Sequence, residues 1–404
     1  MASTVLPLRI VESTDLTISV TNRGKPNMAD RNMIRLGVIG TGLAVEKLHW
    51  PALKRLSDKF QITAYANHTK PKADHFAEYS HTSTDRFSAD YRDLLARDDV
   101  DAVLISLPID LLLRTTADAL AAGKHIICEK PAGANEQEGR AFVKLVSSHP
   151  KLKVLIAENW FYRDDLRFAR SLLDEDAIGD LHLVSWRLVN QLIPRAGEFS
   201  STPWRHHAKY VGGPHLDGGV HHTAQIRFLC GDVNRLHGET QDSNSTHSGP
   251  SDLALNFRMV SGAIGDYTAS YPEIAVAGES NDMRLYGTKG QMTIGRQGIN
   301  VARPDGTSDT WHVQQQDGGY YNEFLNFYDA ILYDTPIVGT VVQSFRNMEI
   351  VLKGLESARK GQVISLSDLP AALSATAVPL WKPRGASDLF EGLDMTITKE
   401  SGQG

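Results

Sequence analysis

The stretch IRLGVIGTGLAVE, residues 34–46, decides the fold expected for this chain. Its first half is a short apolar run that ends in glycine, which is typical of a buried parallel strand. Gly40 and Gly42 then form a Gly-x-Gly turn before a segment with helical spacing, and such a turn lets the backbone approach a pyrophosphate at the positive end of the helix. Val45 stands where a third glycine is usual, and an ordinary strand–helix turn is the alternative interpretation. The stretch therefore predicts a dinucleotide site.

Strand and helix patterns alternate after this stretch up to about residue 157. Four further apolar strands are expected in FQITAYA (60–66), DAVLISLP (101–108), HIICEKP (125–131) and KVLIAEN (153–159). Helical segments separate them, and this alternation is typical of right-handed βαβ units with a parallel sheet between two layers of helices. We therefore expect a dinucleotide-binding α/β domain over 34–157, preceded by an N-terminal extension over 1–33.

A second pattern follows, in which several strand-like runs are separated by short turns. Consecutive strands of this kind indicate an antiparallel sheet. The expected strands are LHLVSWRLV (181–189), LALNFRMV (253–260), GAIGDYTASY (262–271), DMRLYGT (282–288), GQMTIG (290–295) and GINVARP (298–304). Two late helices are expected in EFLNFYDAIL (323–332) and SFRNMEIVLKGLESARKG (344–361). These elements predict an α+β domain over 158–370 and a turn-rich C-terminal tail over 371–404.

The composition is that of a soluble globular protein. The chain has 404 residues, of which 41% are hydrophobic and 22% charged, and its formal net charge is −6. This weak acidity argues against nucleic-acid binding, because nucleic-acid binders carry strong basic patches. No apolar run approaches the ~18 residues of a membrane span. The two cysteines, Cys128 and Cys230, exclude a disulfide framework and favour a reducing compartment, so we expect a cytoplasmic protein.

The end of the second expected strand bears on the choice of cofactor. NAD sites usually place an acid there, which binds the ribose hydroxyls. This chain instead has Asn67, His68 and Thr69, followed by Lys70 and Lys72. With no carboxylate to repel a 2′-phosphate and with two cations nearby, the sequence favours NADP(H) over NAD(H). The alternative is that both lysines are solvated residues at the start of a helix.

Three motifs carry a family resemblance, in the order GVIGTG (37–42), AAGKHIICEKP (121–131) and GGPHLDGGVHH (212–222). Over roughly residues 34–370 the chain resembles the glucose–fructose oxidoreductase/inositol dehydrogenase (Gfo/Idh/MocA) family. The resemblance implies an N-terminal Rossmann fold and a C-terminal domain with a large open antiparallel sheet, through which a homodimer or homotetramer is expected to form. It also implies hydride transfer between a nicotinamide and a secondary alcohol or ketone of a sugar or cyclic polyol.

The resemblance also implies which residues are catalytic. Lys130, Asp217 and His221 are expected beside the substrate, with Glu129 and Pro131 completing the motif on the cofactor side. An imidazole suits proton transfer, because its ordinary pKa is near ambient pH. If a helix begins near Asp217, His221 lies one turn further on the same face, where Asp217 would share the substrate hydroxyls or orient the imidazole. Whether Lys130 or His221 moves the proton stays open.

The expected cofactor contacts come from the ends of strands and the turns after them, where ligands bind in open α/β sheets, and from the segment before the glycine-rich stretch. They are Gly40, Thr41, Gly42, Leu43, Ala44, Asn67, His68, Thr69, Lys72, Leu107, Pro108, Glu129, Lys130, Asn159, Trp204 and Arg205. Trp160, Arg163, Trp204 and Arg205 are also candidates for the substrate pocket, because aromatic faces and forked donors suit sugars. The alternative for each is a core tryptophan or a paired surface arginine.

A cluster of histidines raises the question of a metal site. Its members are His206, His207, His215, His221 and His222. Zinc sites have characteristic ligand spacing and supporting outer residues, and adjacent histidines point apart in most backbones. We therefore expect no metal, and we expect His222 to pack in the interior or to face solvent.

Two other functions are compatible with the motifs. In the first, a tightly held dinucleotide is recycled, and the net reaction is an epimerisation, an elimination or a glycoside cleavage. In the second, the chain is a ligand-sensing regulator without catalysis. Such a regulator is expected to have lost Lys130 or His221, and both are present. The substrate and the favoured direction of the reaction stay open.

Overall fold

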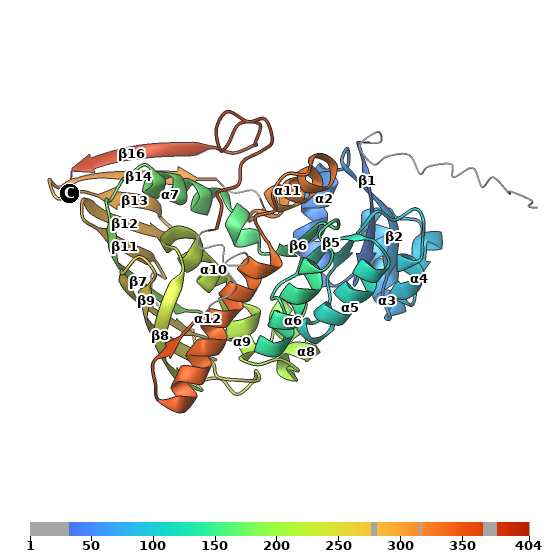
Figure 1. Cartoon of the computed structure of the whole chain (residues 1–404), viewed down its shortest axis with the longest axis horizontal. Helices are drawn as coiled ribbons and strands as arrows, with labels where there is room; N and C mark the ends of the chain where they lie inside the picture. Colours follow the sequence, from blue (N-terminus) through green and yellow to red (C-terminus); the bar gives the residue numbers. More distant parts are fainter. Residues whose placement is uncertain (1–31, 276–280, 315–316, 367–377, 404) are drawn as a thin grey trace, which may run out of the picture.

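The structure is a computed structural model that describes residues 32–275, 281–314, 317–366 and 378–403. Figure 1 shows a parallel sheet with its helices on one side of the molecule and a larger curved sheet on the other, with α10 (Gly219–Cys230) and α12 (Val341–Lys360) between them. The expected N-terminal extension over 1–33 lies outside the described residues, apart from its last two. Within these ranges no helix is long and apolar enough to cross a membrane.

The first sheet is parallel and has the strand order of a Rossmann fold. Among the described residues the order is β3-β2-β1-β4-β5-β6. The strands are β1 (Ile34–Ile39), β2 (Phe60–Ala66), β3 (Phe87–Ser88), β4 (Ala102–Ile105), β5 (His125–Glu129) and β6 (Val154–Ala157). The order reverses between β1 and β4, and ligands of open α/β sheets bind at the carboxyl ends of the strands at such a point. The expected fold is confirmed; only β3, two residues long, gave no signal in the sequence.

Helices cover both faces of this sheet, which explains why its strands are continuous apolar runs instead of alternating ones. All four residues of β4 and of β6 are buried. The helical segments are η1 (Val45–His49), which is a π-helical turn, α2 (Trp50–Arg55), α3 (Lys70–Ser80), η2 (Thr84–Arg86), α4 (Tyr91–Leu95), α5 (Ile109–Ala121) and α6 (Glu136–Ser147).

The second sheet has the order β15-β8-β9-β10-β7-β11-β12-β13-β14-β16 within the described residues. Its strands are β7 (Leu181–Val189), β8 (Val233–Gln241), β9 (Asp252–Met259), β10 (Ile264–Ser270), β11 (Met283–Gly287), β12 (Gly290–Gly295), β13 (Gly298–Ala302), β14 (Thr307–Val313), β15 (Ile364–Ser365) and β16 (Ile397–Gln403). All neighbours pair antiparallel except β10 and β7, which are parallel. The expectation of a large, mostly antiparallel sheet is confirmed.

The strands at and next to both ends of this sheet, namely β8, β14, β15 and β16, were not predicted from the sequence. Most side chains of β8 are exposed, and β16 reads ITKESGQ, with polar residues at nearly every position. End strands of a sheet meet solvent on more sides than central ones, so the apolar alternation that marks a strand is weak there. β16 lies in the segment predicted as a turn-rich tail, and it pairs along the whole of β14.

The inner face of the second sheet is covered by helices. On β9, Leu253, Leu255 and Phe257 are buried against these helices, while Asn256 and Arg258 are exposed on the other face. The helical segments of this part are η3 (Asn159–Tyr162), α7 (Asp164–Asp174), η4 (Phe199–Ser201), α8 (Pro203–His206), α9 (Gly213–Asp217), α10, α11 (Tyr320–Tyr333) and α12. The alternation on β9 therefore matches the pattern of a sheet with one buried face.

A buried arginine joins α10 to α12. The Arg227 side chain is 1% exposed. Its guanidinium donates to Asp232 Oδ1 at 2.5 Å, to Asn347 Oδ1 at 2.6 Å, and to the Gln343 carbonyl and side-chain oxygens at 2.9 and 2.6 Å. A buried charge is tolerated only when it is paired and hydrogen-bonded. Because every guanidinium nitrogen has an acceptor, this group can fix the position of α10, on which His221 lies.

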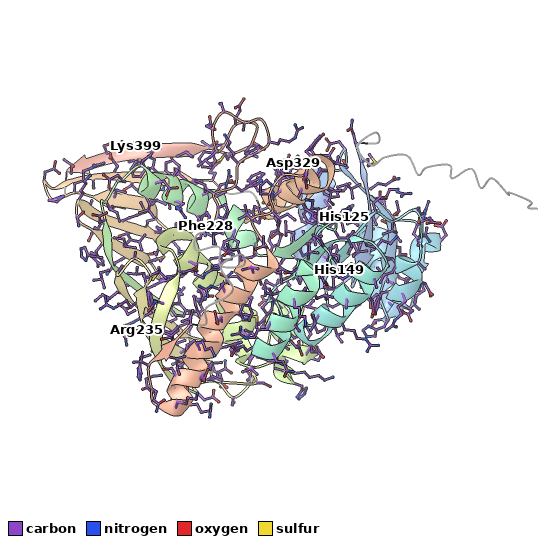
Figure 2. All side chains as sticks on the ribbon, viewed as in Figure 1. His125, His149, Phe228, Arg235, Asp329 and Lys399 are labelled. Atoms are coloured by element: carbon purple, nitrogen blue, oxygen red, sulfur yellow. The ribbon has the colours of Figure 1, made fainter. Side chains whose placement is uncertain are left out.

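We expect Arg227→Ala to lower the free energy of unfolding by about 3–5 kcal/mol, because Asp232 would stay buried after its main cation is removed. Chemical denaturation followed by circular dichroism measures this change. Arg235 is exposed on β8 (Figure 2) and provides the matched control, since Arg235→Ala should change the same quantity by no more than ~0.5 kcal/mol. If the free energy of unfolding falls by the same small amount in both variants, Arg227 has no stabilising role.

Candidate active site

The turn after β1 forms an open cradle at the carboxyl end of the first sheet. Gly40 has a φ of 87°, and a Cβ atom there would lie 2.1 Å from the backbone oxygen of Ser106, so only glycine fits between β1 and the segment after β4. At Gly42 an added Cβ would meet nothing within 4 Å. The backbone at Gly42 is therefore free to approach a phosphate, and the turn fits the dinucleotide expected from the sequence.

Lys130 and Asp217, two of the three expected catalytic residues, meet at the end of β5. Lys130 Nζ donates to the backbone oxygen of Asp217 at 2.7 Å and to its Oδ1 at 3.2 Å. Arg205 binds the same carboxylate, with Nε 2.5 Å from Oδ2 and Nη2 3.2 Å from Oδ1. Burial alone would raise the pKa of Asp217, but Lys130 and Arg205 outweigh it and hold this pKa well below its usual range. Asp217 is therefore a permanent carboxylate and not a proton carrier near neutral pH.

Asp217 lies at the end of a helix and not near its start, which was the condition for placing His221 one turn further on. The helix α9 begins at Gly213 and ends at Asp217, and α10 follows after Gly218, which has helical φ and ψ of −98° and −38°. Pro214 explains the difference, because proline is favoured in the first turn of a helix and starts this one early. His221 still lies in the turn after Asp217, because the backbone continues helically between the two.

His221 is held by a carboxylate that the sequence analysis did not single out. The Nδ1 atom of His221 lies 2.5 Å from Oε1 of Glu158, whose side chain is 1% exposed. Trp160 stacks on the imidazole, with ring centroids 5.5 Å apart and planes inclined by 10°. Asp217, which the sequence suggested as an orienting group, is instead bound to the two cations. The signal for Glu158 was its position directly after a parallel strand, where site residues gather in such sheets.

A second imidazole–carboxylate pair lies at the end of β5. His49 Nε2 is 2.7 Å from Glu129 Oε1, and the His49 ring is buried against the rings of Tyr320 and Phe324, at centroid distances of 5.3 and 5.8 Å. Burial alone would raise the pKa of Glu129, but the hydrogen bond and charge of His49, together with Lys130, lower it below its ordinary value. Glu129 is thus an ionised group anchored to the first domain.

The end of β2 carries a hydrogen-bonded network. Asn67 Nδ2 donates to Thr41 Oγ1 at 2.9 Å, and the Thr69 N–H donates to Asn67 Oδ1 at 2.8 Å. The Thr41 hydroxyl donates to the Lys72 carbonyl at 3.2 Å, which links this end to the Gly-x-Gly turn. Lys70 pairs with an acid of its own helix, Asp74.

The other histidines of the cluster are placed by packing. His222 Nδ1 lies 2.8 Å from the Tyr267 hydroxyl, and burial lowers the pKa of His222 to about 3. His215 is also buried, and burial lowers its pKa to about 4. His206 Nδ1 lies 2.6 Å from the backbone oxygen of Thr246. In the part of the chain that the structure describes, no group of three or more His, Cys, Asp or Glu residues is arranged to hold a metal ion.

The remaining predicted contacts lie on segments that meet the same edge of the first sheet. Asn159 Nδ2 donates to the Gly318 carbonyl at 2.8 Å, while Asn159 Oδ1 is buried without a partner. Trp204 lies beneath the guanidinium carbon of Arg205, which is 4.2 Å from its ring centroid. Leu43, Ala44, His68, Leu107 and Pro108 lie in the turns after β1, β2 and β4. Arg163, a candidate for the substrate pocket, is instead paired with Asp165.

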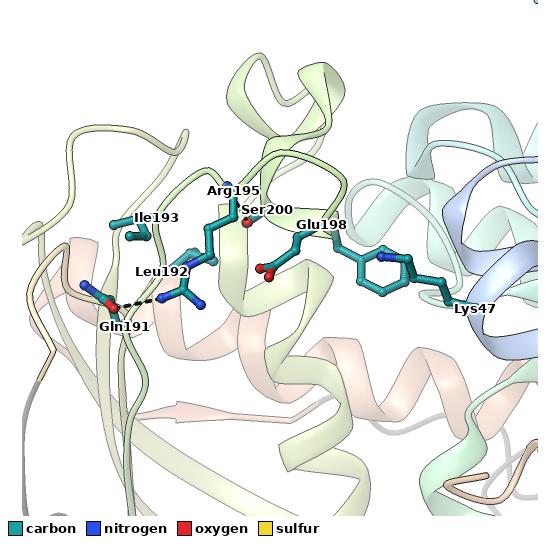
Figure 3. A pocket seen from close by; sticks show the side chains of 8 residues that line it. Lys47, Gln191, Leu192, Ile193, Arg195, Glu198 and Ser200 are labelled. Atoms are coloured by element: carbon teal, nitrogen blue, oxygen red, sulfur yellow. Dashed lines mark hydrogen bonds between the residues drawn. The ribbon is translucent and has the colours of Figure 1, made fainter. Parts of the chain in front are cut away.

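A cavity of about 380 Å³ opens between η1 and the segment after β7 (Figure 3). It is lined by Lys47, Gln191, Leu192, Ile193, Arg195, Glu198, Phe199 and Ser200. Lys47 Nζ donates to the Gly197 carbonyl at 2.6 Å, so this segment contacts the first domain. Arg205 Nη1 donates to the Phe199 carbonyl at 3.3 Å. The wall of the cavity is thereby connected to the residue that binds Asp217.

Comparison with known proteins places these features in a family. Residues 34–156 match the profile described as an oxidoreductase family with NAD-binding Rossmann fold (GFO_IDH_MocA), and residues 166–293 match the GFO/IDH/MocA C-terminal domain. A solved oxidoreductase from Thermotoga maritima is 31% identical, with a TM-score of 0.75, and the match covers 82% of this chain and 98% of that one.

Two further relatives are known from their sequences. An uncharacterized protein of Saccharomyces cerevisiae is 26% identical over 346 residues, which are 81% of this chain and 96% of that protein. A dTDP-3,4-didehydro-2,6-dideoxy-α-D-glucose 3-reductase of Streptomyces violaceoruber is 28% identical over 297 residues, which are 68% of this chain and 79% of the reductase. The two profiles reach into both sheets, and the fold agrees with them. This chain belongs to the Gfo/Idh/MocA family of NAD-binding oxidoreductases.

Proposed function

We propose that this protein transfers hydride between a nicotinamide cofactor, with NADP(H) favoured, and a secondary alcohol or ketone of a sugar or cyclic polyol. The observation that carries the proposal is the ion pair between Lys130 and Asp217, 3.2 Å long, with His221 in the next helical turn. This arrangement gathers a cation, a permanent carboxylate and an imidazole at the sheet edge that also has the Gly-x-Gly turn, where dinucleotides bind in such folds.

Lys130 is the group that binds the reacting oxygen of the substrate. An ammonium has three N–H donors, and the backbone and carboxylate oxygens of Asp217 take two of them, which leaves one for the substrate. In the direction from alcohol to ketone, this donor stabilises the negative charge that develops on the oxygen as its proton leaves. When bound, the nicotinamide supplies the group that accepts or gives the hydride. Either Lys130 or His221 moves the proton.

NADP(H) is favoured because the end of β2 offers hydrogen-bonding groups and a cation where NAD sites usually have a carboxylate. Asn67 and Thr69 lie there, and Lys72 is exposed in the first turn of α3. Lys70 contributes less to this argument than the sequence implied, because Asp74 already pairs with it.

The carbohydrate class of the substrate is supported by the Streptomyces violaceoruber relative, whose name describes reduction of a dTDP-linked deoxy sugar. Absorbance of the reduced nicotinamide, followed after mixing the enzyme with NADP⁺ and candidate sugars, tests the net reaction. A recycled cofactor would instead give product without a lasting change in that absorbance.

We also infer that the chain forms a homodimer or homotetramer through the outer face of the second sheet, in the cytoplasm. Cys128 and Cys230 are both unpaired, which fits a reducing compartment. Light scattering coupled to gel filtration measures the mass of the assembly, and a mass equal to one chain would contradict this inference.

We expect Lys130→Met and His221→Ala each to lower kcat by about 10²–10⁴-fold, because each removes a group that stabilises charge or moves a proton in the transition state. NADPH binding, measured by fluorescence titration, should persist in both variants. Lys151 is exposed, so Lys151→Met is the matched control and should keep wild-type turnover. Unchanged turnover in both site variants would remove the proposed catalytic roles.

We expect Asn67→Asp to lower the ratio of kcat/KM for NADP(H) to that for NAD(H) by about tenfold or more. A carboxylate there would repel the 2′-phosphate, and two like charges at close range cost on the order of 1–4 kcal/mol. The oxygen that accepts from the Thr69 N–H is retained in the variant. Steady-state kinetics with both cofactors measures the ratio, and Asn234→Asp on the exposed surface of β8 is the control for added charge. An unchanged ratio would argue against a 2′-phosphate site at the end of β2.

A further inference from the structure

We propose that Glu158 is the positioning residue of the His221 imidazole: it fixes the proton on Nδ1 and leaves Nε2 as the atom that exchanges a proton with the substrate. This inference rests on the proposed function, because it assigns His221 a role in that reaction.

The hydrogen bond between Glu158 and His221 determines which nitrogen of the imidazole holds the proton. His221 Nδ1 lies 2.5 Å from Glu158 Oε1. An ionised carboxylate only accepts hydrogen bonds, so Nδ1 must be the donor and hold the proton. In a neutral imidazole the other nitrogen, Nε2, then has the free lone pair. No other hydrogen bond of this ring occurs among the described residues, and 18% of the His221 side chain is exposed. Nε2 is therefore the nitrogen available to a ligand.

The ring is fixed in its plane as well as at its edge. Trp160 stacks on it with planes only 10° apart, and the backbone N–H of Trp160 donates to Glu158 Oε1 at 3.4 Å. The Arg163 guanidinium carbon lies 4.7 Å from the Trp160 ring centroid. The residue before η3 thus provides the carboxylate at the edge of the imidazole, and the second residue of η3 provides the indole on its face. A half-turn of the ring about its Cβ–Cγ bond would put Cδ2 in the place of Nδ1 and break the hydrogen bond, and a smaller rotation would tilt the ring out of its stacking on Trp160.

The other acids that the structure describes near the site do not bind His221, so Glu158 is the carboxylate that positions its ring. Asp217 is occupied by two cations, and Glu129 is paired with His49. Glu323 is fully buried with neither carboxyl oxygen hydrogen-bonded, and burial, followed by the charges of neighbouring acids, raises the pKa of Glu323 well above its ordinary value. Glu323 is therefore neutral. It lies close to Glu158 and makes no hydrogen bond with His221, so it is suitable for a control substitution.

The His49–Glu129 pair is a second contact between an imidazole and a carboxylate, and it provides a comparison for the His221–Glu158 pair. Its distance is 2.7 Å, but the His49 side chain is fully buried and enclosed by aromatic rings. His221 differs in being partly accessible beside Lys130 and Asp217. Both imidazoles bind a carboxylate, His49 through Nε2 and His221 through Nδ1, but only the His221 ring is partly exposed and can be reached by a ligand.

The test is Glu158→Gln in the full chain labelled with ¹⁵N-histidine. An amide has donors as well as an acceptor, so it releases the constraint on the tautomer, and the Nε2 signal of His221 should move toward the protonated value. The His221 signals are assigned by their absence in His221→Ala. Glu323→Gln is the matched control, because it replaces a neutral buried acid, and it should leave the His221 tautomer unchanged. An unchanged tautomer in Glu158→Gln would overturn the proposal.

Kinetics on the sugar identified by the absorbance assay provide the second readout. Glu158→Gln should lower kcat by about 10²-fold or more with KM changed less than about threefold, and Glu158→Asp should restore part of the loss. NADPH affinity and the circular dichroism spectrum verify that each variant is folded. If Lys130→Met and His221→Ala abolish turnover while Glu158→Gln keeps both tautomer and kcat, only the positioning role fails. If none of the variants alters turnover, the proposed function itself fails.

Discussion

The carboxylate of Asp217 connects the two parts of the molecule through Lys130, and Arg205 binds the same carboxylate from within its own part. Lys130 reaches it from the end of β5, and Arg205 reaches it from α8, twelve positions before it in the chain. Removing one partner from a buried group of charges leaves an uncompensated charge, which costs far more than a missing surface pair. The position of α9 relative to the first sheet is therefore tightly determined. Because α10 follows α9 along the same helical path, the position of α9 also determines where the imidazole of His221 lies.

The site combines this charged contact with a rigid apolar frame. Arg227 joins α10 to α12, and apolar side chains of the second sheet pack in the core. Several polar groups of the site are held by defined partners, such as Glu158 for His221 and Asn67 for Thr41. Such a frame keeps catalytic groups in place before a ligand arrives, which is the condition under which fixed charges act most strongly on a reacting atom.

The sequence predicted the fold where burial was strong. The parallel strands of the first sheet, apart from the two-residue β3, and the central strands of the second sheet are apolar runs, and each was located. The strands β8 and β16, next to one end of the second sheet and at the other, were not located, because most of their side chains meet solvent. For the site, the motifs indicated Lys130, Asp217 and His221. Glu158 was missed because no local pattern joins it to a ring 63 positions away. Pairings of this kind depend on how the two sheets pack, and residue spacing does not encode that.

The parallel pairing of β7 with β10 has a consequence for how the chain folds. Ser185 and Asp266 face each other across these strands although they are 81 positions apart in the chain. The intervening loop contains α8, α9 and α10, so the centre of the second sheet closes around the segment that holds Asp217 and His221. Closing a loop of this length is slow, because its entropy is lost before its contacts form. The segment that holds Asp217 and His221 therefore lies within the long connection that must close before β7 and β10 can pair.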